Sequence, residues 1–406
     1  MKILVTGAKG FIGKNLIAEL QNKQTKEQQE KGTSLIEMIF EYDQDTNPEL
    51  LKTYTKECDF VYHLAGVNRP ENNDAFMTGN FGFTSTLLDQ LKAQGNKAPI
   101  MLASSTQATQ NNPYGQSKKA GEELLFNYGK ETGSKVLIYR FPNVFGKWCK
   151  PNYNSAVATF CHNIARDLPI QVNDPEVLMH LVYIDDVVEE LLHALEGHEH
   201  REEAETKKAF SDDIINVVKI NQKRLQTGKQ FCSVPIVQTI KLGEIVTLIK
   251  SFKNSRKTLE VPNMKDPFTK KLYATYLSDL PEEVFSYPLK MHVDARGSFT
   301  EFIRTPERGQ VSINVSKPGI TKGNHWHHTK NEKFLVVKGR GLIRFRKIGS
   351  DHTIDYHVTG DKLEVVDIPT GYTHNIINEG DEEMVTVMWA NEAFDPDKPD
   401  TYFLEV

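Results

Sequence analysis

The chain has 406 residues, and its 49 basic and 54 acidic side chains give a net charge of −5 at neutral pH. Hydrophobic residues make up 39% and charged residues 25%, which is typical of a soluble globular protein of two or three domains. This composition excludes disordered and collagen-like chains, and the negative charge makes nucleic acid an unexpected partner.

The four cysteines lie far apart without Cys-x-x-Cys spacing, so the sequence predicts neither a disulfide framework nor a thiolate zinc site. No apolar run approaches the roughly 18 residues that cross a bilayer. The first residues, MKILVTG, begin a strand pattern at once and leave no room for a secretory signal. We therefore expect a cytoplasmic protein without a membrane partner.

The first half of the chain alternates short apolar runs with longer amphipathic segments. Strands are predicted at 2–6, 34–40, 60–65, 99–104 and 135–140, with helices between them. This alternation favours an α/β Rossmann-type doubly wound parallel sheet. The polar stretch 21–34 is expected to lengthen the first helix.

The remaining segments predict a second domain of another class. Residues 197–232 read as an exposed insertion, and helices are expected at 242–252 and 266–279. From about residue 288, short β-type runs alternate with glycine turns, which favours an all-β barrel. We predict two domains, 1–287 and 288–406.

Three glycines, Gly7, Gly10 and Gly13, lie between the first predicted strand and the first predicted helix. Glycine there lets the backbone turn tightly and approach a pyrophosphate at the helix N-terminus. The spacing is Gly-x-x-Gly-x-x-Gly, and such a trio is a weak signal by itself. Its position directly after the strand favours a dinucleotide site.

Tyr114 and Lys118 lie one turn apart on a predicted helix and therefore share a face. An ammonium beside a phenol is expected to lower the pKa of the phenol, making it a usable proton donor and acceptor. Upstream, Ser104 and Ser105 end a strand at the edge where such sheets bind ligands. A hydroxyl there could orient a substrate oxygen, with Ser105 in the catalytic set.

This constellation resembles the extended short-chain dehydrogenase/reductase family, in which a nicotinamide delivers a hydride and the tyrosine protonates a carbonyl oxygen. The resemblance implies that Ser104, Arg140, Asn143 and Lys147 bind the sugar nucleotide. It implies that the cofactor contacts Gly7, Gly10, Phe11, Gly13, Leu64, Ala65, Gly66, Tyr114 and Lys118.

The residues after the second strand bear on the choice between NAD and NADP. Glu41, Asp43 or Asp45 could bond a ribose 2′-hydroxyl but would repel a 2′-phosphate, and the next basic residue along the chain is Lys52. Alternatively, these acidic residues only cap the next helix. The pattern favours NAD and leaves NADP open.

The second candidate site lies in the predicted barrel. His325, His327 and Glu332 follow a His-x-His-x4-Glu spacing, and His374 comes further on in PTGYTHNIIN. Alternate residues of a strand share a face, so these side chains can converge on a divalent metal: zinc, iron, manganese or nickel. Both segments resemble the two cupin motifs, although the opening glycine of the second is displaced.

A metal beside a ketone makes the hydrogen on the neighbouring carbon acidic, so that it can be removed and returned on the other side. DARGSFTEF (294–302) resembles the opening of the deoxysugar 3,5-epimerase branch of cupins, whose substrates are nucleotide-linked 4-keto sugars. Candidate proton carriers are Tyr372, Lys317, Lys322 or a histidine at the site. We assign Tyr372 to the catalytic set.

The whole chain resembles the bifunctional UDP-sugar epimerase and reductase family of bacterial capsular polysaccharide synthesis, on the route to UDP-N-acetyl-L-fucosamine. The shared strings include ATQNNPYG, FGKWCKPNYNS and KGNHWHHTKNEKFLVV. The resemblance implies a homodimer, zinc in the cupin, NADPH as reductant and a UDP-4-keto-6-deoxy-N-acetylhexosamine substrate. Two alternatives stay open: a reductase fused to an Fe(II) cupin oxygenase, and a non-catalytic nucleotide or sugar sensor.

Overall fold

The computed structural model describes residues 1–68, 72, 74–201, 230–305 and 307–406. The chain divides into two compact units: unit 1 comprises Met1–Ile249 and Lys271–Leu280, and unit 2 comprises Lys250–Lys270 and Pro281–Val406. The segment 250–270 contacts the rest of unit 2 through its backbone, since the Val261 amide donates to the Arg304 carbonyl at 2.9 Å. The domain boundary at 288 stays a prediction.

A five-stranded parallel sheet forms the centre of unit 1, in the order β2-β1-β3-β4-β5. Its strands are β1 (Lys2–Thr6), β2 (Met38–Tyr42), β3 (Phe60–His63), β4 (Ile100–Ser105) and β5 (Val136–Phe141). The helices and helical turns between and after them are α1 (Phe11–Lys31), α2 (Glu49–Glu57), α3 (Asp74–Phe76), η1 (Met77–Gly82), α4 (Phe83–Ala93), η2 (Thr106–Thr109), α5 (Pro113–Thr132) and α7 (Ile184–Leu195). The predicted doubly wound sheet is confirmed.

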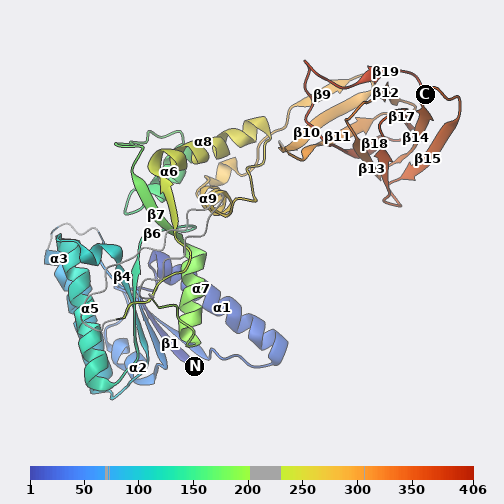
Figure 1. The fold of residues 1–406 in the computed structure, drawn as a ribbon. Helices are drawn as coiled ribbons and strands as arrows, with labels where there is room; N and C mark the ends of the chain where they lie inside the picture. Colours follow the sequence, from blue (N-terminus) through green and yellow to red (C-terminus); the bar gives the residue numbers. More distant parts are fainter. Residues whose placement is uncertain (69–71, 73, 202–229, 306) are drawn as a thin grey trace. The chain divides into compact units, whose positions relative to one another are not determined.

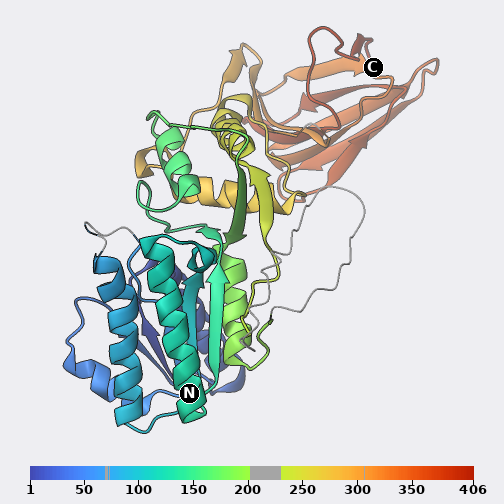
Figure 2. The same ribbon diagram turned by 60° about the vertical axis from the view of Figure 1, so that its left-hand side comes forward.

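Two apolar clusters hold helices against both faces of this sheet (Figures 1 and 2). On one face, Leu16 of α1 and Leu191 of α7 pack with Ile3 of β1. On the other face, α2, α4 and α5 contribute buried leucines such as Leu87 and Leu125. This alternation of layers places the carboxyl ends of the strands, where the predicted catalytic residues lie, at one edge.

The predicted second strand begins too early. Residues 34–36 are not extended with the sheet, because Glu27 of α1 accepts hydrogen bonds from the Ser34 hydroxyl at 3.0 Å and the Leu35 amide at 2.9 Å. These bonds tie the segment to the helix, and β2 begins only at Met38. The lengthening of the first helix is confirmed, since α1 extends to Lys31.

The rest of unit 1 carries a small mixed sheet in the order β6-β7-β8. Its strands, and the helices that lie between and after them along the chain, are β6 (Asn143–Phe145), α6 (Ala156–Ala165), β7 (Leu178–Tyr183), β8 (Gln238–Lys241), α8 (Leu242–Thr258) and α9 (Pro267–Ser278). The second half of α8 and the first residues of α9 belong to unit 2. The helices expected at 242–252 and 266–279 are confirmed by α8 and α9. Most of the predicted insertion at 197–232 lies outside the described residues. No helix among the described residues has the length and apolarity to cross a bilayer.

Unit 2 is built from two antiparallel sheets, in the orders β16-β13-β18-β11-β10-β9 and β15-β14-β17-β12-β19. After the short turn η3 (Glu282–Val284), its strands are β9 (Met291–Asp294), β10 (Gly297–Thr305), β11 (Gly309–Ser316), β12 (Thr321–Trp326), β13 (Glu332–Lys338), β14 (Arg340–Lys347), β15 (Thr353–Thr359), β16 (Val365–Ile368), β17 (Tyr372–Asn378), β18 (Met384–Ala390) and β19 (Tyr402–Phe403). Phe334, Ile343 and Ile376 belong to one buried apolar cluster contributed by both sheets. The predicted all-β cupin barrel is confirmed.

Candidate active sites

The turn after β1 requires glycine, because a side chain at these positions would collide with neighbouring backbone atoms. Gly7 has φ +71°, and a Cβ there would lie 2.6 Å from the Ala65 amide nitrogen, while a Cβ on Gly13 would lie 2.2 Å from the Gly7 carbonyl oxygen. The turn therefore packs directly against the Leu64–Gly66 segment that follows β3. No side chain caps the N-terminus of α1, so its first amides can meet a pyrophosphate. These residues fit a dinucleotide.

Helix α5 brings Tyr114 and Lys118 together as the spacing predicts. The Lys118 ammonium nitrogen lies 5.8 Å from the centre of the Tyr114 ring and donates to the Ala103 carbonyl of β4 at 3.1 Å. The Tyr114 hydroxyl donates to the Asn68 side chain at 3.1 Å and is hydrogen-bonded to Ser105 at the end of β4. The sequence patterns assigned no role to Asn68.

The pKa of Tyr114 departs from the expectation. Burial raises the pKa of this phenol, against a lowering hydrogen bond from Ser105, so Lys118 does not bring it toward neutrality. Burial also lowers the pKa of Lys118 to about 8, although the charge of Glu122 acts in the opposite direction. In this geometry Tyr114 remains a protonated donor at neutral pH, and Lys118 is the group that titrates near the physiological range.

Arg140 and Ser104, both predicted as substrate contacts, bond to the carboxylate of Glu122, and their substrate-binding role stays a prediction. Arg140 is 9% exposed, and its guanidinium donates twice to the buried Glu122 carboxylate, at 2.8 and 2.6 Å. The Ser104 hydroxyl donates to the same carboxylate at 2.5 Å. Both side chains therefore form a buried network with Glu122 of α5. Glu122 was missed, although its position four residues after Lys118 was a usable signal.

The other two predicted substrate contacts lie at the surface of unit 1. Asn143 begins β6 and is exposed, and Lys147 forms an ion pair with Asp185 at the start of α7. The Asn15 side chain of α1 donates to the Lys147 carbonyl at 3.3 Å. Both residues remain candidates for substrate contact.

Lys9 bears on the choice between NAD and NADP, because it lies beside the acidic residues that follow β2. Lys9 in the glycine turn donates through its amide to Asp43 at 2.7 Å, and its ammonium forms an ion pair with Asp45. Sequence reasoning placed the nearest basic residue at Lys52, because it considered only residues that follow β2 along the chain. The site therefore holds both carboxylates and a cation where the cofactor's 2′ position is expected.

Unit 2 brings the four predicted metal ligands together. His325, His327, Glu332 and His374 each offer one atom, and these atoms lie within 4.8 Å of one another. His327 and His374 direct their Nε2 atoms at Glu332 Oε2, at 3.5 and 3.4 Å. Those three atoms are buried without a hydrogen-bond partner. Buried polar atoms without partners are costly, so this donor set fits a divalent metal such as zinc.

The charges at this cluster suit a metal. Burial, followed by the charge of His374, lowers the pKa of His325 to about 4, so its imidazole is neutral and able to ligate at neutral pH. Burial acts to raise the pKa of Glu332, but the neighbouring imidazoles of His327 and His374 outweigh it and lower the pKa, so this carboxyl is ionised. Neutral imidazoles and a carboxylate are the forms that bind metals.

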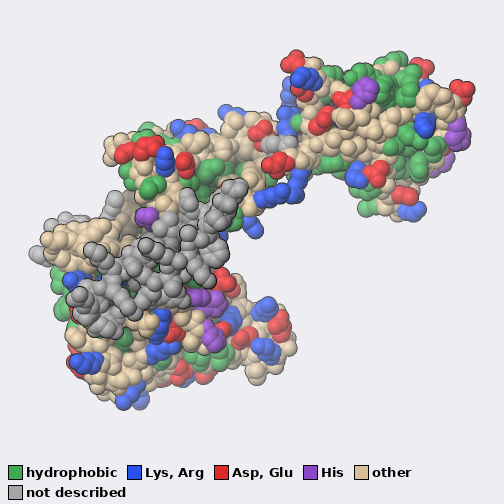
Figure 3. Space-filling model, in the orientation of Figure 1, with side chains coloured by type: hydrophobic (Ala, Val, Ile, Leu, Met, Phe, Trp, Pro, Cys, Tyr) green, Lys and Arg blue, Asp and Glu red, His purple; other side chains and the backbone are tan. Residues whose placement is uncertain are grey.

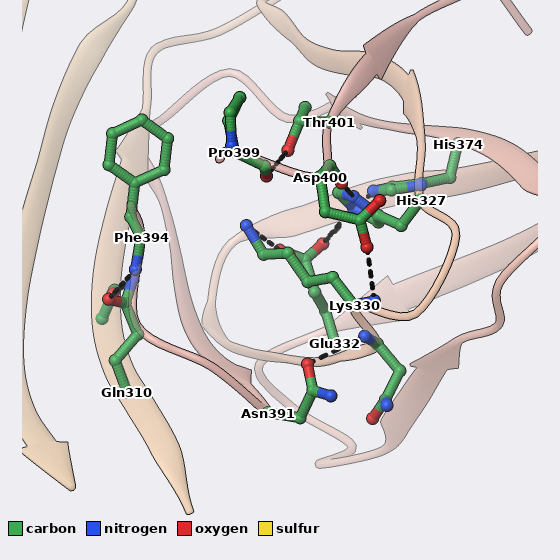
Figure 4. A network of polar contacts seen from close by, with 12 residues as sticks. Gln310, His327, Lys330, Glu332, His374, Asn391, Phe394, Pro399, Asp400 and Thr401 are labelled. Atoms are coloured by element: carbon green, nitrogen blue, oxygen red, sulfur yellow. Dashed lines mark hydrogen bonds and ion pairs between the residues drawn. The ribbon is translucent and has the colours of Figure 1, made fainter. Parts of the chain in front are cut away.

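Asp400, in the C-terminal segment, contacts the ligand His327 and the loop that follows it (Figure 4). The Asp400 carbonyl oxygen lies 2.6 Å from His327 Nδ1, which fixes the ring so that Nε2 faces the ligands. The Asp400 carboxylate accepts hydrogen bonds from the backbone amides of residues 328–330. The sequence patterns assigned no role to this segment.

A cavity of about 550 Å³ opens beside the cluster, with His325 and His374 in its wall. Asp294, Arg296 and Lys322 also line it. The Lys322 ammonium donates to Asn314 at 2.7 Å and to the Val315 carbonyl at 2.9 Å. Tyr372 does not line this cavity, because it packs against the apolar cluster of the barrel instead. The catalytic role of Tyr372 stays a prediction.

Family models match both units. Residues 3–210 match the NAD dependent epimerase/dehydratase family, and residues 292–402 match the polysaccharide biosynthesis C-terminal domain. The chain thus belongs to the NAD dependent epimerase/dehydratase family, which supports a nicotinamide cofactor.

Relatives that align over the whole chain make the assignment within this family more specific. The chain is 42% identical to the UDP-2-acetamido-2,6-beta-L-arabino-hexul-4-ose reductase of Pseudomonas aeruginosa, over 100% of this chain and 99% of the relative. It is 53% identical to the capsular polysaccharide assembling protein CapF of Staphylococcus aureus, with a TM-score of 0.85 and complete coverage of both chains. A second crystal form of that protein aligns completely at 49% identity and a TM-score of 0.79. The chain is therefore a CapF-like UDP-sugar epimerase/reductase.

Proposed function

We propose that this chain converts a UDP-4-keto-6-deoxy-N-acetylhexosamine in two steps on the route to UDP-N-acetyl-L-fucosamine. The barrel inverts C3, and unit 1 then reduces the C4 ketone to a UDP-N-acetyl-6-deoxy-L-talosamine. One observation carries the proposal: the unpartnered ligand cluster forms part of a cavity in the same chain that carries the Tyr114–Lys118 pair. The Pseudomonas relative, named as a reductase of a hexul-4-ose, supports the reducing half.

In the proposed reduction, a bound nicotinamide supplies the hydride to C4. Tyr114 donates its hydroxyl proton to the oxygen that gains negative charge, which its raised pKa permits at neutral pH. Ser105, hydrogen-bonded to Tyr114, positions the same oxygen. The nearby charge of Lys118 stabilises the phenolate that remains after proton transfer.

In the proposed epimerisation, His325, His327, Glu332 and His374 hold a divalent metal that polarises the C4 ketone as a Lewis acid. Lys322 is the proton carrier we propose in place of Tyr372, because it lines the cavity and burial lowers its pKa. Asn314 and the Val315 carbonyl fix its ammonium group. Arg296 and Asp294, at the same wall, can bind the sugar nucleotide.

The order of the two steps follows from the chemistry of the ketone. The C3 hydrogen is acidic only while C4 carries a carbonyl, and reduction at C4 removes that carbonyl. Inversion must therefore precede reduction.

The decisive experiment incubates the UDP-keto sugar with the protein in D2O under nitrogen, with and without reduced nicotinamide. We expect deuterium at C3 without reductant, and reduced product only with it. Tyr114→Phe should abolish reduction while leaving deuterium exchange at the wild-type rate. Loss of both activities in a folded Tyr114→Phe protein would contradict the division of labour.

The metal ligands have their own test. His374→Ala should remove the metal from the barrel and stop deuterium exchange, while hydride transfer to a pre-epimerised substrate continues. Full metal occupancy by elemental analysis would refute the ligand assignment. Consumption of dioxygen with Fe(II), without exchange at C3, would favour an oxygenase instead.

The cofactor and the assembly complete the proposal. The carboxylates after β2 favour NADH, whereas Lys9 and the family resemblance favour NADPH, and the ratio of kcat/KM for the two decides between them. We also propose a homodimer, as the resemblance implies, which light scattering coupled to gel filtration checks.

A further inference from the structure

A second group of metal-ligating side chains lies in unit 1, apart from the residues of the proposed reductase site. Glu190 and His193 are on α7, and His200 follows the end of that helix. One ligand atom from each lies within 4.8 Å of the other two. We call these three residues the Glu190 cluster. Figure 3 shows histidine side chains gathering with acidic and basic ones on the surface of unit 1.

The two oxygens of the Glu190 carboxylate have different partners. Oε1 accepts hydrogen bonds from the Tyr139 hydroxyl at 2.7 Å and from the His200 amide at 2.8 Å. Oε2 faces two imidazoles: His200 Nδ1 at 2.5 Å and His193 Nδ1 at 3.9 Å. The carboxylate is buried, with a side chain 1% exposed, and both histidines reach it from solvent. Oε1 is thus fixed by the protein, and Oε2 is presented to two nitrogen donors.

The backbone holds His200 in place before any ligand arrives. Its carbonyl accepts a hydrogen bond from the Ser233 amide at 3.0 Å. The next residue, Arg201, pairs with Cys232, whose amide donates to the Ile138 carbonyl of β5 at 2.8 Å. His193 is placed by its position three residues after Glu190 on the helix, which puts both on one face. The ligand set is therefore preorganised.

We propose that the Glu190 cluster binds a divalent transition-metal ion, with Zn²⁺ or Ni²⁺ as the chemical class that two imidazoles and one carboxylate prefer. Glu190 Oε2, His193 Nδ1 and His200 Nδ1 are the ligands, and water completes the coordination. The ion replaces the proton between His200 and the carboxylate, and each imidazole keeps its proton on Nε2.

The spacing of the ligands is compatible with one ion. Two ligands of a tetrahedral zinc site lie about 3.3 Å apart, between the distances of 2.5 and 3.9 Å observed from Oε2 to the two nitrogens. Small rotations of two half-exposed rings reach that geometry without moving the buried carboxylate. The Tyr139 hydroxyl then orients the carboxylate through its other oxygen, as outer-shell partners of metal sites do.

Such an ion would fasten the chain leaving α7 back onto that helix, next to the backbone pairing of Arg201 with Cys232. Its role in this position is structural, because the proposed reductase residues Tyr114, Lys118 and Ser105 are not in the cluster. Residue 200 belongs to the segment that interrupts the α/β pattern in the sequence. The proposal thus assigns metal binding to the start of that segment, a function separate from the proposed catalysis.

The test uses the untagged, full-length, metal-stripped protein, dialysed against Zn²⁺ and analysed for bound zinc. We expect His193→Gln and His200→Gln each to bind one ion fewer per chain than the wild type. The matched control is His198→Gln, an exposed histidine outside the cluster, which should bind as much as the wild type. All four proteins retain the barrel ligands, so the difference is independent of the proposed epimerase site.

Equal zinc in the wild type and in both cluster variants would overturn the proposal. So would an equal loss in His198→Gln, because it would show general surface binding. As a second measurement, Tyr139→Phe should weaken zinc binding at the cluster about 10-fold or more without changing the stoichiometry. Unchanged affinity in Tyr139→Phe would contradict the outer-shell role assigned to the Tyr139 hydroxyl. Circular dichroism and thermal unfolding check that each variant is folded.

Discussion

The buried ion pair between Glu122 and Arg140 gives a sharp prediction for Glu122→Gln. The side chains are only 2% and 4% exposed, and the carboxylate also accepts the Ser104 hydroxyl. Gln keeps the shape of the side chain but removes its charge, so a guanidinium remains buried beside a neutral amide. Breaking such a pair from one side costs about 3–5 kcal/mol of the free energy of unfolding. At about 2–4 °C per kcal/mol for a unit of this size, the midpoint of thermal unfolding should fall by about 6–20 °C.

The assay is thermal or urea unfolding, followed by circular dichroism. Glu131→Gln is the matched control, because its exposed ion pair with Lys92 is worth about 1 kcal/mol or less. The double variant Glu122→Met/Arg140→Met removes both charges of the pair and should recover most of the lost stability. A single variant as stable as Glu131→Gln, or a double variant no better than the single, would refute the reasoning.

Two further predictions concern pH and cofactor. Lys118 is charged below its pKa of about 8 and neutral above it, so kcat/KM for reduction should fall as the pH rises through about 8, while deuterium exchange in the barrel shows no loss tied to Lys118. A reduction rate that is flat from pH 7 to 10 would rule out a required ammonium. Asp45→Asn frees Lys9 from its exposed ion pair, so the NADPH to NADH ratio of kcat/KM should rise by about 1.5- to 5-fold, as expected for an exposed pair; an unchanged ratio would count against Lys9 facing the 2′ position.

The fold was predictable from the sequence because its signals are local. Strand β1, the glycine turn and α1 follow one another within the first residues, and the spacing of apolar residues sets the layers. The start of β2 was not predictable from that spacing. Leu35 and Ile36 have strand character, but Glu27, seven residues upstream, binds Ser34 and holds the segment to the helix.

The candidate sites follow the same rule. Tyr114 with Lys118 and His325 with His327 are close in sequence, so spacing alone brings them together. The ion pair of Arg140 with Glu122 was not predicted, because the two residues lie on different elements and are far apart in sequence. Tyr372 lies two residues before His374, but nothing in the motif shows that it packs into the apolar cluster instead of the cavity.

The attachment of Asp400 to the barrel has a consequence for how the protein can be handled. One residue near the end of the chain both anchors a loop through three amides and sets the tautomer of His327. A fusion partner or a proteolytic cut close to that end would therefore act on the imidazole's orientation at a distance, even if every ligand were intact. An affinity tag is better placed at the amino terminus. A tag close to Asp400 would weaken metal binding, and that loss would be mistaken for an intrinsic property of the protein.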